Sequence, residues 1–346
     1  MKSAFGRSLA RALRLALASL VLAAAAGLAV LAIASRPAEG IGQGGLATVE
    51  KGDSAQSVAA ALARKGFIRS AFAFRLLARA EGVGSSLRAG TYRIGPGMGA
   101  KEILDTLVSG KQALSRITVP EGFTLSQIAG LLDRLGIVDR ASFLQAATSS
   151  VLLSELGIQA ASAEGFLFPD TYYLPLGYSA ESIVRIMVRA FRDRVAAIPE
   201  TAALSPKELY DRLTLASIVE REYKAPEEAP MIASVFYNRL KIRMALQSCA
   251  TVVYVITERL DRPHPDVIYD RDLKLVDPYN TYEHRGLPPG PISNPGMTAL
   301  KAVFYPEASR YLYFRLIDPE AGTHHFSTTL EEHLDARNLF IKKVGG

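Results

Sequence analysis

The stretch VEKGDSAQSVAAALARKGFI at residues 49–68 has a second copy, VPEGFTLSQIAGLLDRLGIV, at residues 119–138. The two copies align without gaps, and their matched positions are Gly52 with Gly122, Ser54 with Thr124, Val58-Ala59 with Ile128-Ala129, Arg64 with Arg134, and Gly66 with Gly136. Each copy reads as a strand, a glycine turn and then an apolar helical repeat. The sequence therefore predicts the same strand–turn–helix unit twice.

The ends of both predicted helices carry capping residues. Ser54 and Thr124 are hydroxyl residues of the kind that accept a hydrogen bond from a free amide of the first turn. Thr124 is followed three residues later by Gln127, which makes a capping box. Gly66 and Gly136 stand where a helix closes on a residue in the left-handed conformation.

The first copy belongs to a small α+β module over residues 47–112. A second helix is expected within 67–80, a strand over 88–94, and a third helix over 100–109 that Gly110 ends. The module resembles the LysM-like domain that precedes some cell-wall enzymes. That resemblance implies a shallow surface for N-acetyl sugars; because binding aromatics are not visible in the sequence, a spacer that positions the following domain is an equal alternative.

An apolar segment precedes the module. Residues 15–34, LALASLVLAAAAGLAVLAIA, contain no charge, and at ~1.5 Å per residue a helix of this length spans a ~30 Å hydrocarbon core. Four basic residues lie in the preceding segment 1–14, whereas only Arg36 follows closely. This asymmetry predicts a cytoplasmic tail, a single transmembrane helix and a chain that continues across the membrane.

A cleaved signal peptide is the alternative for this segment, with Ala32-Ile33-Ala34 as its cleavage site. Its apolar region would be ~7–15 residues, shorter than the run observed, so a retained anchor is favoured. Residues 35–46 are rich in glycine and proline and predict a linker.

Length and charge set broad limits. The 346 residues allow about two domains, and the net charge of +6 suits an anionic partner such as a cell-wall polymer or a membrane surface. No nucleic-acid-binding motif is present, so no nucleic-acid partner is expected. Cys249 is the single cysteine, which excludes an internal disulfide.

Residues 113–346 predict a mixed α+β catalytic domain. Helices are expected over 182–195 and 205–222, and strands over 311–316 and 325–327. Between them, proline, glycine, tyrosine and asparagine gather within 277–296, as in a long structured binding loop. The fold class is therefore α+β, with a transmembrane helix, a LysM-like module and this domain in that order.

Glu220 interrupts an apolar pattern. At ~100° per residue its helical direction falls between those of Leu209 and Leu213 and beside Ala216, whereas Glu222 points to a more polar flank. Burial raises the pKa of a carboxyl group, so Glu220 would keep a proton near neutral pH and act as an acid. A solvated glutamate at a helix end is the alternative that periodicity alone favours.

A set of motifs changes that balance. In chain order they are Glu164-Gly-Phe-Leu-Phe-Pro-Asp170-Thr-Tyr172, Leu215-Ala-Ser-Ile-Val-Glu220-Arg-Glu222, Ala233-Ser-Val-Phe-Tyr-Asn238-Arg239-Leu240, Leu246-Gln247-Ser248, Pro278-Tyr279-Asn280-Thr281-Tyr282, Gly286-Leu-Pro-Pro-Gly290-Pro-Ile, Asn294-Pro-Gly296, Ala299-Leu-Lys301-Ala302 and Tyr311-Leu-Tyr-Phe314. From about residue 45 to its end the chain resembles the YceG-like family. The resemblance implies an endolytic peptidoglycan transglycosylase in which Glu220 is the catalytic glutamate.

The implied reaction breaks the MurNAc–GlcNAc β-1,4 bond of nascent glycan strands and leaves 1,6-anhydro-MurNAc ends, which terminates strand elongation. One local departure from the family pattern is Cys249-Ala250, where relatives usually have Asp-Pro. Without the proline this loop is expected to be softer by about 0.4–1 kcal/mol, and restoring Asp-Pro is expected to raise stability.

Aromatic rings can stack on sugars and amides can bond acetamido groups, so the polar residues of the motifs are candidates for binding substrate. They are Asn238, Gln247, Ser248, Tyr254, Tyr279, Asn280, Thr281 and Tyr282. The alternative for each is a structural role in a turn. His324, His325 and His333 lack acidic partners at ligand spacing, so neither a metal nor another cofactor is expected.

The family resemblance also implies partners and location. Peptidoglycan glycan strands would be the substrate, peptidoglycan synthases the protein partners, and the bacterial inner membrane the site, with the catalytic domain in the periplasm. The alternative function is a catalytically weak glycan-binding or scaffold protein of the wall-synthesis machinery, for which the Cys249-Ala250 departure leaves room.

Overall fold

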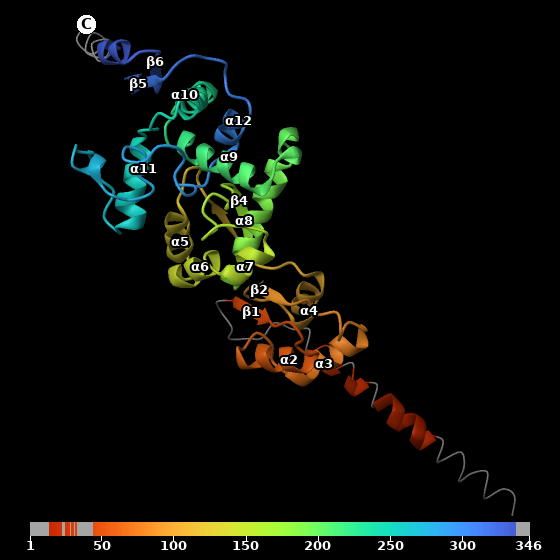
Figure 1. Cartoon of the computed structure of the whole chain (residues 1–346). Coiled ribbons are helices and arrows are strands. Elements are labelled where there is room, and N and C mark those ends of the chain that lie inside the picture. Colours follow the sequence, from red (N-terminus) through yellow and green to blue (C-terminus); the bar gives the residue numbers. More distant parts are fainter. Residues whose placement is uncertain (1–13, 23–24, 28, 31, 33–43, 337–346) are drawn as a thin grey trace, which may run out of the picture. The chain divides into compact units, whose positions relative to one another are not determined.

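The computed structural model describes residues 14–22, 25–27, 29–30, 32 and 44–336 (Figure 1). Within 44–336 the chain divides into two compact units. The smaller unit consists of residues up to 115 together with 173–177, and the larger consists of 116–172 together with 178 onward.

The predicted apolar segment 15–34 is only partly covered. Its described positions are helical, and positions 23–24, 28, 31 and 33–34 lie outside the described residues. Among the positions that the structure does describe, no helix is both long and apolar enough to cross a membrane.

The smaller unit follows the order that the sequence predicts. Its elements are β1 (Gly45–Val49), α2 (Ala55–Arg64), α3 (Ala71–Ala80), β2 (Gly90–Ile94) and α4 (Ala100–Ser109). β1 and β2 pair antiparallel, with Gly45 opposite Ile94 and Val49 opposite Gly90. Phe74, Tyr92 and Leu104 are fully buried between this ribbon and the helices.

The larger unit is mostly helical. Its elements are α5 (Leu125–Arg134), α6 (Arg140–Ala147), α7 (Ser150–Glu155), α8 (Ala180–Val195), η1 (Pro199–Ala203), α9 (Pro206–Val219), η2 (Pro226–Glu228), α10 (Ala229–Lys241), α11 (Cys249–Tyr254), η3 (Val255–Arg259), η4 (Asp272–Lys274), α12 (Met297–Phe304), β5 (Tyr313–Asp318) and β6 (Thr323–Ser327). β5 and β6 form an antiparallel hairpin. A further pair joins β3 (Leu114–Thr118) and β4 (Thr171–Pro175). Mixed α+β architecture with small sheets is thus confirmed.

Both copies of the repeat form the predicted unit. Ser54 and Thr124 are the N-cap residues of α2 and α5, and each side chain accepts a backbone N–H of the first turn. The capping box of Thr124 and Gln127 is present. Gly52, Gly66, Gly122 and Gly136 all have positive φ, the conformation that glycine adopts without a steric penalty.

Helix α9 lies in the middle of the core of the larger unit. It packs against α10 and α12, which Figure 1 shows around it. Every residue from 213 to 219 is buried, so the C-terminal half of α9 is surrounded by protein on all sides. A helix held in this way fixes the position of whatever follows its last residue.

Candidate active site

Glu220 is the residue that follows the last turn of α9. Ser205 caps the start of this helix, and Pro206 occupies the first turn, where a missing N–H costs nothing. The predicted helix 205–222 is three residues too long at its C-terminal end, because Arg221 and Glu222 donate to carbonyls three residues back and tighten the chain into a turn. Glu220 itself keeps helical dihedral angles, φ −53° and ψ −31°.

The carboxyl group of Glu220 is partly buried and held by two donors. The backbone N–H of Gly296 donates to Oε2 at 2.9 Å, and the Tyr223 hydroxyl lies 3.3 Å from both oxygens. Burial raises the pKa of Glu220 to about 7, an effect that Glu121 adds to and that the Gly296 N–H, Tyr223 and Arg221 oppose. A carboxyl group that titrates near neutral pH can both donate and accept a proton, as the sequence predicted for Glu220.

The Gly296 N–H is positioned by the segment 292–296, which docks on the middle of α9. The backbone N–H of Ile292 donates to Ser217 Oγ at 2.9 Å, and Ser293 Oγ donates to the Ser217 carbonyl at 3.0 Å. Ser217 and Ser293 are fully buried. The donor to Glu220 is therefore fixed by hydrogen bonds to the same helix that ends at Glu220.

Asn294 connects this segment to two others. Its Nδ2 donates to Glu164 Oε1 at 2.8 Å and to the Phe123 carbonyl at 2.9 Å, and its Oδ1 accepts the Leu167 N–H at 2.9 Å. Both Glu164 oxygens accept the Leu125 N–H at 3.0 Å. Burial raises the pKa of Glu164 to about 8, so this carboxyl group is largely protonated at neutral pH.

The glycine turn of the second repeat copy forms another side of the site. Gly122, with φ +72°, donates its N–H to the Asn294 carbonyl at 2.9 Å, and its own carbonyl accepts Arg221 Nη1 at 3.1 Å. A Cβ atom at Gly122 would lie 3.5 Å from Glu220 Cγ. The repeat thus packs against the Glu220 side chain.

Among the predicted substrate-binding residues, Asn280 and Thr281 have a structural place. Asn280 is fully buried, and its Nδ2 donates to the carbonyls of Leu273 and Leu275. Thr281 is buried as well, with its Oγ1 accepting the Ser248 N–H at 3.0 Å. Their polar groups are used inside the protein, so in this structure they hold the loop instead of facing a substrate.

Ser248 is likewise buried, and its Oγ donates to Glu222 Oε1 at 2.5 Å. The N–H of Ala250 also bonds to the Glu222 carboxylate, and burial raises the pKa of Glu222. Glu222 lies beyond the end of α9, so its direction is set by the turn that follows the helix, and its partners there are polar groups. Gln247 is exposed and has φ +52°, a strained conformation that turns its side chain toward solvent.

The three predicted tyrosines are partly buried. The rings of Tyr254 and Tyr279 lie 5.0 Å apart, with the guanidinium of Arg259 5.7 Å from the Tyr279 ring. The Tyr282 hydroxyl lies 3.2 Å from the Cys249 thiol. Each ring keeps an accessible part, and sugar stacking on them stays a prediction.

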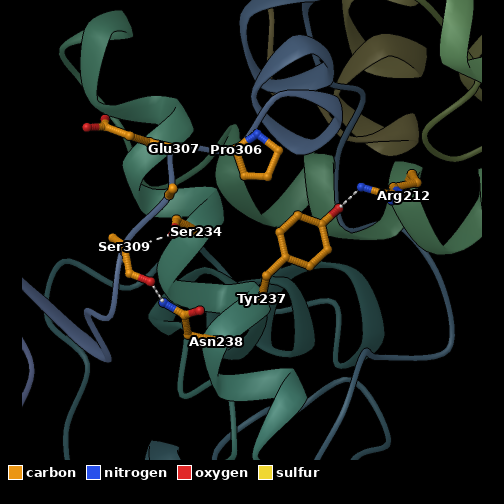
Figure 2. Close-up of a pocket in the computed structure, with 8 residues that line it drawn as sticks. Arg212, Ser234, Tyr237, Asn238, Pro306, Glu307 and Ser309 are labelled. Carbon is orange, nitrogen blue, oxygen red and sulfur yellow. Dashed lines mark hydrogen bonds between the residues drawn. The ribbon is translucent and has the colours of Figure 1, made fainter.

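Asn238 lines a separate pocket of about 400 Å³ (Figure 2). Its Nδ2 donates to the Ser309 and Tyr311 carbonyls, both at 3.0 Å, which ties α10 to the chain before β5. The lining residues are Arg212, Ser234, Tyr237, Asn238, Pro306, Glu307, Ala308 and Ser309. Glu220 is not among them, and substrate binding by Asn238 stays a prediction.

One of the three histidines, His324, has an acidic partner that sequence spacing did not indicate. His324 Nδ1 lies 2.7 Å from Glu228 Oε2, and the same carboxylate accepts the His324 N–H. Within 44–336 and the shorter described stretches, no three side chains of histidine, cysteine, aspartate or glutamate are arranged to hold a metal ion.

Four residues near Glu220 were not selected from the sequence. Gly296 and Tyr223 donate to its carboxyl group, Glu121 acts on its pKa, and Asn294 holds the segment that contains Gly296. Asn294 and Gly296 lie in a quoted motif, and Glu121 lies in the repeat, but position along the chain does not show which of them meets Glu220. The candidates taken from the sequence were side chains, whereas the closest donor to the Glu220 carboxyl group is the backbone N–H of Gly296.

Fold and site together define the class of this protein. In a mixed α+β unit, the carboxyl group of Glu220 lies at the end of a buried helix, and its pKa is raised to about 7. Such a group can donate and accept a proton near neutral pH, as a general acid/base enzyme requires. The chain belongs to the YceG-like family, whose model matches residues 47–338.

Similar proteins extend this result. An endolytic murein transglycosylase of Bacillus subtilis is 31% identical over 309 residues, which cover 85% of this chain and 84% of that protein. An endolytic murein transglycosylase of Streptococcus pneumoniae is 28% identical over 314 residues, and the match spans 82% of this chain but only 56% of the longer relative. The crystal structure of a putative yceG-like protein from Listeria monocytogenes superimposes with a TM-score of 0.58 at 32% identity, covering 85% of this chain and 99% of that one.

Proposed function

We propose that this protein is an endolytic murein transglycosylase, a lyase that cleaves the MurNAc–GlcNAc β-1,4 bond within peptidoglycan strands. The observation that carries the proposal is the Glu220 carboxyl group, whose pKa is raised to about 7 by burial and which the Gly296 N–H and the Tyr223 hydroxyl hold in place. The names of the Bacillus and Streptococcus relatives support the same activity.

The reaction needs one carboxyl group, because the substrate contains its own nucleophile. Protonated Glu220 gives its proton to the glycosidic oxygen, and the bond from that oxygen to C1 of the muramyl ring breaks. The C6 hydroxyl of the same ring then bonds to C1, and its proton passes to the Glu220 carboxylate. No water is consumed, and the intramolecular attack has a high effective concentration, which reduces what the protein must supply.

A second carboxylate is required in most glycoside hydrolases, where it acts as nucleophile or activates water. Here the Gly296 N–H points at Oε2 of Glu220 and stabilises the carboxylate form once the proton has left. Burial favours the protonated form, and the balance between the two lets Glu220 return to its starting state after each cleavage.

The domain organisation follows from the same proposal. Residues 1–14 would be a cytoplasmic tail, 15–34 a transmembrane helix, 35–46 a linker, 47–112 a LysM-like module and 113–346 the catalytic domain. The β–α–α–β order of the smaller unit, with its strands antiparallel, supports the LysM-like assignment. The uncharged run and its basic flank support a single-pass inner-membrane protein with a periplasmic catalytic domain.

Such an anchor would hold the enzyme where new glycan strands leave the membrane, so that cleavage would terminate their elongation. Peptidoglycan synthases are the partners that this placement calls for, because they release the strands that are cut.

The test incubates the full-length protein with purified glycan strands and measures the new ends by mass spectrometry. We expect 1,6-anhydro-muramyl ends, and in H₂¹⁸O no label at those ends. Glu220→Gln keeps the volume and hydrogen bonding of the side chain but has no proton to transfer, so cleavage is expected to fall by at least about 100-fold while circular dichroism stays unchanged. Glu331→Gln, which removes an exposed carboxylate, is the matched control.

Two results would overturn the proposal. Label from H₂¹⁸O at the muramyl ends means hydrolysis, and glycan binding without new ends means a binding or scaffold protein. Glu220→Gln with more than a tenth of the wild-type rate would show that another group is the acid.

A further inference from the structure

A second acidic side chain reaches the donor that holds Glu220. A Cβ atom at Gly296 would lie 1.8 Å from Oε1 of Glu121 and 2.2 Å from its carboxyl carbon. The Glu121 carboxylate therefore lies directly against Gly296, the residue whose N–H donates to Glu220 at 2.9 Å. Together with ordinary backbone dimensions, these contacts place the two carboxyl groups within roughly 7 Å of each other.

Glycine at position 296 is needed here for space. Its φ is −81°, which any residue adopts, so backbone conformation does not require glycine. Any side chain would occupy the position of the Glu121 carboxylate. The fold thus keeps room for this carboxylate at the edge of the site.

The two carboxyl groups differ in surroundings. Glu121 is exposed, whereas Glu220 is partly buried against Gly122. Tyr223 and Arg221 are the other titratable groups that act on Glu220; Arg221 is cationic and opposes the influence of Glu121. Arg221 donates to the Gly122 carbonyl, so its charge is held near the backbone of the same turn.

We propose that Glu121 is a positioning residue of the active site, whose negative charge, held beside Gly296, keeps the catalytic proton on Glu220 until substrate arrives. Two carboxyl groups that share a site do not both ionise readily, and the more buried one retains its proton. The direction of the electrostatic effect of Glu121 on the pKa of Glu220 agrees with this role. The proposal rests on the proposed function for its reaction, but the coupling between the two groups can be measured without substrate.

The first experiment compares the pH dependence of kcat/KM for full-length wild type and Glu121→Gln. Removing the negative charge favours ionised Glu220, so the acid form is lost at lower pH. We expect the basic limb of the pH–rate profile, where activity falls as Glu220 loses its proton, to move down by about 0.5–1 pH unit. This is the shift expected for two charges at this distance in a partly aqueous site. Glu331→Gln, an exposed carboxylate elsewhere on the larger unit, is expected to leave the limb in place.

Salt provides a readout that a structural role would not change. Screening lengths fall from about 10 Å at 0.1 M to about 3 Å at 1 M, so added salt weakens the influence of exposed Glu121. In wild type the basic limb is expected to move toward that of Glu121→Gln as salt is added. In the variant, where Arg221 is the remaining nearby charge, the limb is expected to stay or to rise slightly.

A second measurement separates this proposal from the proposed function. The Glu220 carboxyl carbon is titrated by ¹³C NMR without substrate and assigned by its absence in Glu220→Gln. A midpoint lowered in Glu121→Gln supports the coupling even if no anhydro ends are formed. A midpoint that is unchanged within about 0.2 pH unit in Glu121→Gln overturns the proposal, whether or not activity is lost. The proposal is also overturned if wild type leaves ¹⁸O label at the new muramyl ends and Glu121→Gln does not, because Glu121 would then be the base of a hydrolase.

Gly296→Ala gives an independent check from the other side of the contact. Its methyl group forces the Glu121 carboxylate away, which the exposed side chain can accommodate by rotating. The basic limb is expected to move down in the wild-type background and to move little in Glu121→Gln. Equal shifts in both backgrounds would show that Gly296→Ala acts through its N–H and not through Glu121.

Discussion

At the scale of single residues, the raised pKa of Glu220 comes from where α9 ends. The helix is buried on all sides over residues 213–219, and Glu220 is the next residue, so its carboxyl group emerges from the core while still partly desolvated. Two residues later, Glu222 is also desolvated, but its carboxylate is bound by the Ser248 hydroxyl and the Ala250 N–H. One carboxyl group is left to exchange protons, and the other is engaged in holding α11.

This contact changes the expected effect of the Cys249-Ala250 departure. Proline at position 250 would limit the unfolded chain and add about 0.4–1 kcal/mol of stability. It would also remove the Ala250 N–H that bonds to the Glu222 carboxylate, and a hydrogen bond to a charged group contributes about 1.5–3 kcal/mol. The loss is larger than the gain.

Ala250→Pro is therefore predicted to lower the free energy of unfolding by about 1 kcal/mol, measured by urea titration. Ala250→Ser keeps the N–H and serves as the control, with a change expected within about 0.5 kcal/mol. If Ala250→Pro is instead more stable than wild type, Ala250 is a tolerated replacement of the proline that relatives usually have at this position.

At the scale of elements, the site is assembled where the 292–296 segment crosses two others. Ser217 in α9 forms hydrogen bonds with the first two residues of the segment, Ile292 and Ser293. Asn294 bonds to the turn that precedes α5 and to the Glu164 side chain. The glycine turn before α5 is thus tied to the segment that holds Glu220.

Asn294→Ala tests this connection. It leaves the Leu167 N–H without its buried acceptor and removes one of the two donors to Glu164 Oε1, so we expect a loss of about 2–4 kcal/mol in the free energy of unfolding. Because Gly296 is two residues away, kcat is also expected to fall, by about tenfold or more, with a smaller change in KM. Urea titration and steady-state kinetics measure the two effects.

The matched control is Ser293→Ala, which removes one buried hydroxyl donor to α9 and leaves Asn294 in place. Its cost is expected to be about 1 kcal/mol, with a smaller effect on kcat. Equal effects from both variants would mean that the segment is held by α9 alone.

At the scale of the whole molecule, the larger unit buries carboxyl groups in protonated form. The pKa of Glu164 is raised to about 8 and that of Glu220 to about 7, from an ordinary value of 4.5. Between pH 4.5 and 8 the folded protein therefore binds more protons than the unfolded chain. Stability falls with rising pH wherever the folded state binds more protons, so this stabilisation is complete below pH 4.5 and is lost by about pH 8.

We predict that the free energy of unfolding of the larger unit falls by about 4–7 kcal/mol between pH 5 and pH 9, measured by urea titration at several pH values. Glu164→Gln cannot ionise, so it is expected to flatten this slope whatever its absolute stability. A slope that is the same in wild type and Glu164→Gln would show that Glu164 is ionised in the folded protein at pH 7.

Much of the local structure could be predicted from the sequence, because its causes are local. Caps act over three or four residues, and a glycine with positive φ ends a helix wherever it stands, so Ser54, Thr124 and the repeated glycines predicted both strand–turn–helix units correctly. The motifs around Glu220 indicated the family, and the resemblance proposed Glu220 as the acid/base residue. The end of α9 was misplaced, because the tight turn after Val219 is set by packing on all sides of the helix.

The surroundings of Glu220 were decided by the tertiary structure alone. Its donor Gly296 lies 76 residues away, and Arg221 reaches Gly122 across 99 residues. The side chains of Asn280 and Thr281, which were predicted to bind substrate, form hydrogen bonds inside the protein instead. Desolvation and Coulomb interaction depend on distance in space, so the sequence pointed to Glu220 as the candidate acid/base, and the fold determined the pKa of its carboxyl group.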